Sequence, residues 1–344
     1  MHTDELAINA DLVRRLLAAQ FPHWAELPLE RVPSAGTDNA IFRLGDELAL
    51  RLPRIHWAAR QPQRERELLP LLAPHLPLPV PVPIATGEPW LEASPAEPAT
   101  PGRTTVAPFA PPGLEASPAE PATPGRTTVA PFAPPGLEAP PGEGYPWHWS
   151  VVPWLEGENA TLERLADPVA EAVRLAEFVV RLRAIDTAGR PVSGRGRPLA
   201  AVDAETRAAL GKVGDTIDAA AATAAWERAL ATPTWDGPPV WSHGDLMSEN
   251  LLAIDGRVTA VIDFGAISVG DPACDLIVAW KLLPAGAPRE AFRRAVAVDE
   301  ATWARGRGWA LATGLWALPY YVDTNSVLYG IAHRSIDEVL AERS

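Results

Sequence analysis

Cysteine and lysine are nearly absent from this chain of 344 residues. The single cysteine, Cys274, excludes an internal disulfide and a zinc site built from several cysteines, so nothing requires an oxidising compartment. Long apolar runs are missing as well. The most apolar stretch, residues 68–85, is interrupted by six prolines, and charged side chains are scattered through residues 1–20. We therefore expect no membrane-spanning helix and no signal peptide, and hence a cytoplasmic protein.

Basic charge is in deficit. The chain has 30 Lys plus Arg against 43 Asp plus Glu, a formal net charge of −13. Nucleic-acid binding needs clustered basic residues that neutralise phosphates, so we expect no nucleic-acid partner. A small cationic ligand is compatible with this balance. The hydrophobic share of 47% and the length indicate a globular protein of two domains or lobes, at roughly 150 residues per domain.

Proline is in excess, with 38 residues, and part of it lies in a tandem repeat. Residues 91–113 read LEASPAEPATPGRTTVAPFAPPG, and residues 114–136 repeat them without a change. Two proline-rich units cannot stack into a solenoid, so we expect a disordered or polyproline-like insertion over residues 90–141. Docking of a partner protein on this segment is an alternative that we regard as the weaker one.

The rest of the chain predicts strands first and helices later. Residues 38–44 and 47–52 are short apolar runs around Gly45-Asp46, which predicts a β-hairpin. A helix is expected over residues 62–73, a strand over residues 147–152, and a long helix from Pro168 to about Asp186. The buried face of this long helix is expected to carry Val169, Val173, Ala176, Val180 and Leu182. This order is that of an α+β protein.

Oxygen-bearing side chains are concentrated in residues 241–280. His243-Gly244-Asp245 is followed by Asn250, and Asp263-Phe264-Gly265 comes after two apolar runs joined by Asp255-Gly256. Asp-Gly between such runs predicts a hairpin, which brings Asn250 and Asp263 together. Two oxygen ligands suit Mg²⁺ bound to a nucleotide, and Asp245 can accept or orient the proton of an attacking hydroxyl. The set indicates phosphoryl transfer.

Each of these motifs is common when taken alone, and only the ordered set is specific. We expect His243 to be a structural histidine of this loop rather than an acid or base. Asp275 is expected to brace the loop, and Cys274 to be a small buried filler.

The motifs HGDLMSEN, DFG and GDPACDL resemble those of the aminoglycoside phosphotransferase family, a branch of the protein-kinase-like superfamily. The resemblance extends over residues 35–54, 64–81 and 149–158. It implies a two-lobed kinase-like α+β fold, with an N-lobe of antiparallel sheet plus helix and a mostly helical C-lobe. The implied nucleotide-binding N-lobe is residues 1–89 plus 142–152, and the C-lobe with the catalytic loop and the acceptor site is residues 153–344.

The resemblance also implies roles for single residues. Asp245 would be the catalytic base, Asn250 and Asp263 the magnesium ligands, and Glu65 the carboxylate that orients the phosphate-binding cation. The remaining nucleotide contacts would come from Ser34, Gly36, Thr37, Val152, Pro153 and Trp154. Arg51 stands where such enzymes usually have a lysine, and an arginine fork is longer and planar. The alternative is that Arg51 faces solvent on its strand.

The implied cofactors are Mg²⁺ and ATP, with GTP as an alternative, and the implied partner is a small-molecule acceptor. Acceptor candidates in the C-terminal region are Asp271, Tyr320 and Asp323, since acidic groups there would suit an amino sugar. An aminoglycoside-like or other antibiotic is the leading acceptor. The alternatives are a metabolite (a sugar, an amino alcohol or a glycated amine) and a nucleotide-binding regulator without transfer activity.

Overall fold

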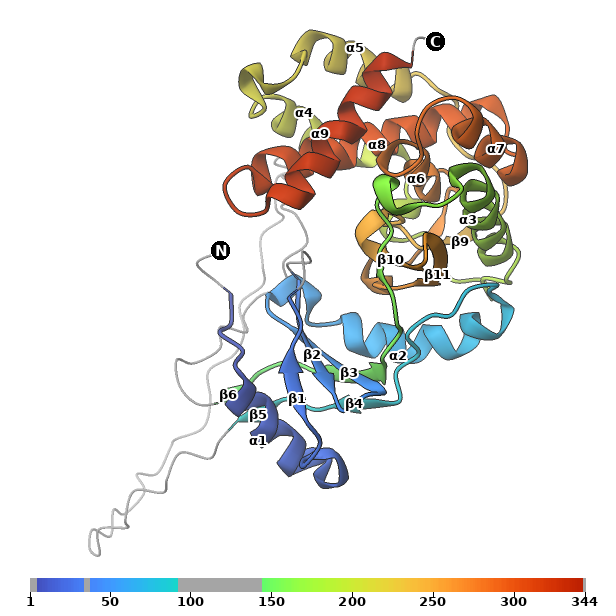
Figure 1. Cartoon of the computed structure of the whole chain (residues 1–344). Coiled ribbons are helices and arrows are strands. Elements are labelled where there is room, and N and C mark those ends of the chain that lie inside the picture. Colours follow the sequence, from blue (N-terminus) through green and yellow to red (C-terminus); the bar gives the residue numbers. More distant parts are fainter. Residues whose placement is uncertain (1–4, 34–37, 92–143, 343–344) are drawn as a thin grey trace, which may run out of the picture. The chain divides into compact units, whose positions relative to one another are not determined.

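The computed structural model describes residues 5–33, 38–91 and 144–342 (Figure 1). Apart from Leu91, the tandem repeat lies outside these residues, as do Ser34, Gly36 and Thr37. The chain divides into two compact units, residues 1–88 with 147–344, and residues 89–146. In the second unit, β5 (Trp90–Leu91) pairs antiparallel with β6 (Gly144–Tyr145). All that follows concerns the first unit.

An antiparallel sheet forms the N-terminal part. Its strand order is β1-β2-β3-β7-β4. The strands are β1 (Leu29–Arg31), β2 (Asn39–Leu44), β3 (Leu48–Pro53), β4 (Ala85–Gly87) and β7 (Trp149–Pro153). The predicted hairpin is confirmed as β2 and β3, and Gly45 adopts the positive φ of +59° that its turn requires. Phe42, Leu44, Leu50 and Leu52 are fully buried and give the sheet its core.

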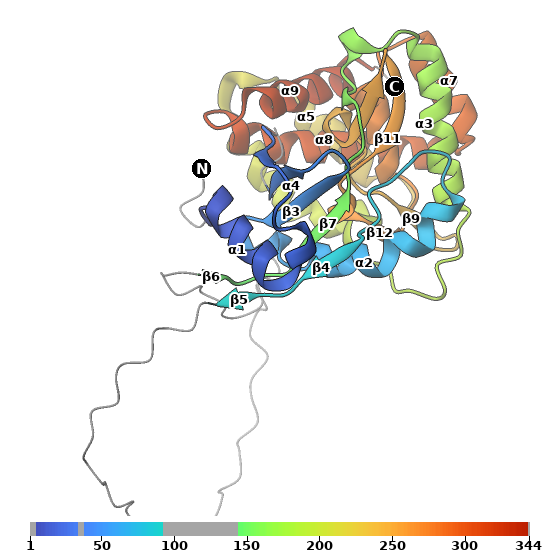
Figure 2. The same cartoon turned by 60° about the horizontal axis from the view of Figure 1, so that its bottom comes forward.

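Two helices accompany this sheet. The helix α1 (Ala10–Gln20) begins where the Asn9 side chain accepts a hydrogen bond from the amide of Leu12. The helix α2 (Gln61–Leu72) confirms the predicted helix. It lies beside β4 (Figure 2), also contacts the DFG segment, and buries Leu68, Leu69 and Leu72. Short 3₁₀ turns lie at Pro22–Trp24, His56–Ala58 and Ala73–His75.

Helices dominate the C-terminal part. They are α3 (Pro168–Arg183), α4 (Asp203–Leu210), α5 (Ala219–Leu230), α6 (Val278–Lys281), α7 (Ala287–Val296), α8 (Glu300–Tyr321) and α9 (Ser326–Ala341). The helix α8 packs against α9, α5 and α4, and much of its length is buried. No helix in the described ranges is long and apolar enough to cross a membrane.

Two small sheets lie among these helices. The first has the order β11-β10-β8, from β8 (Glu158–Asn159), β10 (Leu251–Ile254) and β11 (Arg257–Val261). The second pairs β9 (Val240–Ser242) with β12 (Ser268–Gly270). Further 3₁₀ turns lie at Leu162–Arg164, Gly194–Gly196, Leu199–Val202, Gly214–Thr216, Ser248–Asn250, Phe264–Ala266 and Cys274–Ile277. Asp255 and Gly256 both have positive φ, +51° and +75°, which confirms the hairpin turn between β10 and β11.

The face that the sequence predicted for α3 is wrong at Val169, Val173 and Val180 and confirmed at Ala176 and Leu182. Val169, Val173 and Val180 are 40–47% exposed. The buried side chains are Ala172, Leu175, Ala176, Phe178, Val179 and Leu182. Apolar residues occupy two adjacent stripes of this helix, and the stripe with Leu175, Phe178 and Leu182 packs against α7, β9 and β11. Periodicity alone does not choose between two such stripes.

A close approach of two backbones fixes the loop that follows α3. An added Cβ on Gly196 would lie 2.2 Å from the carbonyl oxygen of Val269, because the two backbones touch. The amide of Asp271 donates to the carbonyl of Gly196 at 2.8 Å, and the amide of Ser193 donates to that of Val269 at 2.9 Å. The loop with Arg195 is thereby held against β12.

We expect Gly196→Ala to lower the free energy of unfolding by on the order of 2–3 kcal/mol, because backbone rather than a flexible side chain must move. Gly211→Ala is the matched control: its φ is −66° and the nearest atom to an added Cβ is 3.6 Å away. The control is expected to be neutral or slightly stabilising. Urea unfolding of both variants checks this, and equal stabilities would contradict it.

Candidate active site

One cavity of about 890 Å³ collects most of the residues singled out from the sequence. The sheet contributes Ile41, Ala49, Arg51, Val152, Pro153 and Trp154 to its lining. The loop of residues 243–250, which we call the HGD loop, contributes Asp245, Met247, Glu249 and Asn250, and Asp263 follows from the next loop. The helices α6, α8 and α9 complete the wall with side chains that include Lys281, Trp316 and Tyr320.

Buried polar groups hold the HGD loop in place. The Asp275 carboxylate accepts from the amides of His243 at 2.9 Å and Gly244 at 2.8 Å. The His243 ring lies 3.0 Å from the carbonyl oxygen of Ile262 and accepts from the Asp245 amide at 3.2 Å. These contacts confirm that His243 is structural and that Asp275 braces the loop. Cys274 is fully buried, as expected for a filler.

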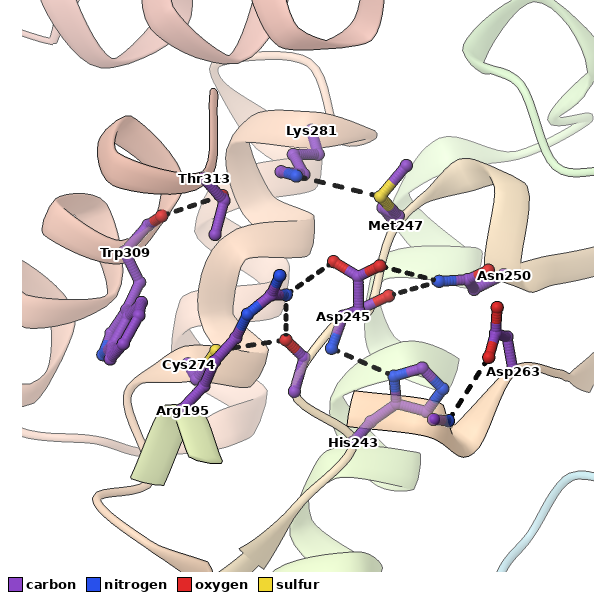
Figure 3. A network of polar contacts seen from close by, with 12 residues as sticks. Arg195, His243, Asp245, Met247, Asn250, Asp263, Cys274, Lys281, Trp309 and Thr313 are labelled. Atoms are coloured by element: carbon purple, nitrogen blue, oxygen red, sulfur yellow. Dashed lines mark hydrogen bonds and ion pairs between the residues drawn. The ribbon is translucent and has the colours of Figure 1, made fainter. Parts of the chain in front are cut away.

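Asp245 is a carboxylate held by neighbouring cations. Arg195 contacts its Oδ1 at 2.7 Å and also donates to the carbonyl of Gly244 (Figure 3). Burial raises the pKa of Asp245, but the charges of Arg195 and Lys281 outweigh burial and hold the pKa below its ordinary value. The side chain remains 31% exposed to the cavity. Asp245 is thus an ionised hydrogen-bond acceptor that a ligand can reach.

Asn250 and Asp263 have the donor atoms that a hard cation requires. The Asn250 Nδ2 donates to the Asp245 carbonyl at 2.8 Å and to Oδ2 of Asp245 at 3.3 Å, which directs the amide nitrogen toward the loop. The Oδ1 of Asp263 accepts from Arg51 at 3.1 Å and from the amide of Gly265 at 3.3 Å. Within the described ranges no cluster of three or more His, Cys, Asp or Glu suits a metal. Two oxygen donors that line the same cavity fit Mg²⁺, which takes its other ligands from phosphates and water.

Arg51 is buried and joins the sheet to the DFG segment. Its side chain contacts Glu65 of α2 at 2.7 Å and Asp263 at 3.1 Å. Burial lowers the pKa of Arg51, but the charges of Glu65 and Asp263 raise the pKa by more than burial lowers it. The guanidinium therefore stays protonated. Arg51 is 8% exposed and lines the cavity, which excludes the alternative of a solvent-facing strand residue.

The acceptor candidates have different environments. Tyr320 lines the cavity, whereas Asp271 and Asp323 do not. Asp271 is 3% exposed and its carboxylate is bound by Arg305 at 2.7 and 3.1 Å, so it holds α8 in place and has no access to a ligand. We therefore correct the acceptor assignment of Asp271. Asp323 is exposed, as solvated acidic residues usually are.

Sequence reasoning missed two cations beside Asp245, namely Arg195 and Lys281. Arg195 lies in an irregular loop among other arginines and has no distinguishing pattern. Lys281 did carry a signal, since it is one of only two lysines and follows the apolar run Leu276–Trp280. A lysine in such a run is rarely buried without a specific partner or role.

Comparison with known proteins agrees with this geometry. The model of the phosphotransferase enzyme family matches residues 30–120 and 130–309. The chain belongs to this family. No curated protein matches the chain in a sequence comparison.

Solved structures show the same fold. An aminoglycoside phosphotransferase in complex with GDP and kanamycin has a TM-score of 0.63 at 16% identity, over 96% of this chain and 98% of that chain. The macrolide 2'-phosphotransferase of Brachybacterium faecium has a TM-score of 0.52 at 24% identity, over the same shares. An aminoglycoside phosphotransferase bound to AMP-PNP and hygromycin B has a TM-score of 0.57 at 19% identity, again over 96% and 98%. This phosphotransferase family chain thus has the two-lobed, protein-kinase-like α+β fold, with an antiparallel sheet in the N-terminal part and helices in the C-terminal part.

Proposed function

We propose that this phosphotransferase moves the γ-phosphoryl group of a magnesium-bound nucleoside triphosphate to a hydroxyl of a small molecule. The observation that carries the proposal is that Asp245, Asn250, Asp263 and Arg51 line a single cavity and face it from two sides. Phosphoryl transfer depends on positioning and on charge stabilisation, which this set supplies.

The nucleotide end of the cavity lies against the sheet. Val152, Pro153 and Trp154 provide a wall for the base, and Arg51 provides a protonated cation for the phosphates. The Oδ1 of Asn250 and the Asp263 carboxylate would hold Mg²⁺, which offsets negative charge on the phosphates when bound. The residues 1–89 and 142–152 then form the nucleotide-binding lobe and residues 153–344 the acceptor lobe, with residues 90–141 as an insertion.

Asp245 acts on the acceptor. Its carboxylate orients the attacking hydroxyl, whose oxygen forms a bond to the γ-phosphorus while the bond from that phosphorus to the bridging oxygen of the nucleotide breaks. The proton of the hydroxyl passes to Asp245 and then to solvent, and the nucleoside diphosphate leaves. Arg195 and Lys281 keep Asp245 ionised and ready to accept this proton.

We expect Asp245→Asn to lower kcat by a factor on the order of 10² or more, because the amide cannot accept the proton. The melting temperature and the nucleotide Kd should stay close to those of the native chain. Asp323→Asn, outside the cavity lining, is the matched control and should retain full turnover. Steady-state kinetics and calorimetry check this, and near-full turnover by Asp245→Asn would refute the assigned role.

The part of the cavity wall that α8 and α9 supply is apolar. The helices α8 and α9 line it with Thr313, Trp316, Ala317, Tyr320, Tyr321, Leu328, Ile331 and Ala332. In the described part of the chain neither helix contributes a carboxylate to the lining. The same cavity is also lined by the cations Arg195 and Lys281 and by the carboxylates Glu205 of α4 and Glu249 of the HGD loop. A polyamine such as an aminoglycoside needs several carboxylates free to pair with it.

This wall favours an acceptor with a broad apolar face and little positive charge. A macrolide fits because it has a large lactone ring and few amino groups. The half-buried Trp316 would pack against the ring.

The test compares phosphorylated products from erythromycin, kanamycin, hygromycin B and a sugar panel by mass spectrometry. We expect a higher kcat/KM for the macrolide, and a KM for it that rises at least about tenfold in Trp316→Ala. Trp235→Ala, which removes a half-buried tryptophan outside the cavity lining, is the matched control. Preferred phosphorylation of kanamycin would contradict the apolar acceptor, and tight nucleotide binding without any transfer would indicate a regulator.

A further inference from the structure

Lys281 is a buried lysine in the wall of the cavity. It ends α6, it is 6% exposed, and it lines the cavity beside Asp245. The other lysine of the chain, Lys212, is exposed. Burying an ammonium group costs free energy unless anions or hydrogen-bond acceptors surround it.

Within the described residues, the hydrogen bond that Lys281 makes is a weak one for a buried ammonium group with three N–H donors. Its Nζ contacts the Met247 Sδ at 3.7 Å, and a thioether is a weak acceptor (Figure 3). Burial lowers the pKa of Lys281, and so does the charge of Arg195; the charges of Asp245, Cys274 and Glu249 offset this in part. The Asp245 carboxylate is already bound by Arg195 and by Asn250. The ammonium therefore has donor capacity left at the cavity wall.

The remaining N–H donors of Lys281 lie where a phosphate of the nucleotide would be. The attacking hydroxyl must lie within hydrogen-bond distance of Asp245, so the γ-phosphorus must lie next to Asp245 as well. Asn250 and Asp263 lie on one side of Asp245, and Lys281 with Met247 lies on another (Figure 3). Oxygens of the γ-phosphoryl group that do not face the metal ligands can thus face Lys281.

Arg51 does not supply this contact by itself. Its guanidinium is bound by Glu65 and Asp263, on the sheet side of the cavity. A lysine is a compact point charge with rotatable donors, which suits an anion whose geometry changes during transfer. A second cation beside Asp245 would stabilise charge on the transferring group from the helical side.

We propose that the Lys281 ammonium binds the γ-phosphoryl group of the nucleotide and acts as a catalytic residue in its transfer. This inference rests on the proposed function of the cavity. It divides the work between two cations: Arg51 holds the phosphates from the sheet, and Lys281 holds the group being transferred from α6.

The test measures discrimination between triphosphate and diphosphate. Calorimetry gives the Kd of AMP-PNP against ADP, and of GMP-PNP against GDP, with and without Mg²⁺. We expect Lys281→Met to weaken triphosphate binding by about 10- to 100-fold, the usual size for a hydrogen bond to a charged group, and to leave diphosphate binding unchanged. Lys281→Arg should recover part of the loss, and Lys212→Met is the matched control with no expected effect.

Each outcome of this experiment either supports or overturns the role of Lys281. An unchanged ratio of triphosphate to diphosphate affinity in Lys281→Met, with the native melting temperature, would overturn the inference and leave the proposed function standing. A rise in acceptor KM with that ratio unchanged would place Lys281 at the acceptor instead, which also overturns it. If Lys281→Met does not fold, Lys281→Gln replaces it in the same measurement. A native chain that binds neither nucleotide series would contradict the proposed function itself.

Discussion

The proposed reaction depends on keeping the carboxylate of Asp245 charged at a largely enclosed position. Burial works against the ionised form of Asp245, and the two cations beside it reverse this effect. Arg195 is available for this role because its loop is held against β12 by the contact of Gly196 with Val269. The environment of Asp245, the proposed reactive group, is therefore fixed by packing of residues that lie far along the chain from the HGD motif.

A second ion cluster connects the two parts of the molecule. Arg51 on β3 reaches Glu65 on α2 and Asp263 in the DFG segment. Because Asp263 has a positive φ of +59° and is tied to the Gly265 amide, its carboxylate has a fixed direction. The same carboxylate thus contacts the cation of the sheet and is one of the two proposed magnesium ligands, so in the proposed function nucleotide and metal bind as one unit.

Much of this arrangement was predictable because it is local in sequence. The turn Asp255-Gly256 sets the β10–β11 hairpin, and the hairpin brings the segments with Asn250 and Asp263 side by side. The order of the HGD and DFG motifs was enough for the fold, since kinase-like proteins place both at the same cavity. The hairpin β2–β3 and the helix α2 likewise follow from turn residues and periodicity.

What was not predictable depends on pairs that are far apart in the chain. Arg195 binds Asp245, which is 50 residues later in the chain. Arg305 binds Asp271, 34 residues earlier, and so keeps its carboxylate out of the cavity lining. Neither pair leaves a pattern along the chain. The apolar acceptor wall was missed for a similar reason: acidic residues such as Asp323 are visible in the sequence, but their distance from a cavity is not.

The pH dependence of kcat/KM measures whether neighbouring cations hold Asp245 ionised. If they do, the acid limb of the native chain lies below the ordinary range of aspartate. In Arg195→Met, burial is no longer balanced in full, so the limb should move up by at least about one pH unit. A native limb at or above the ordinary aspartate value, or a limb that Arg195→Met does not move, would contradict the account.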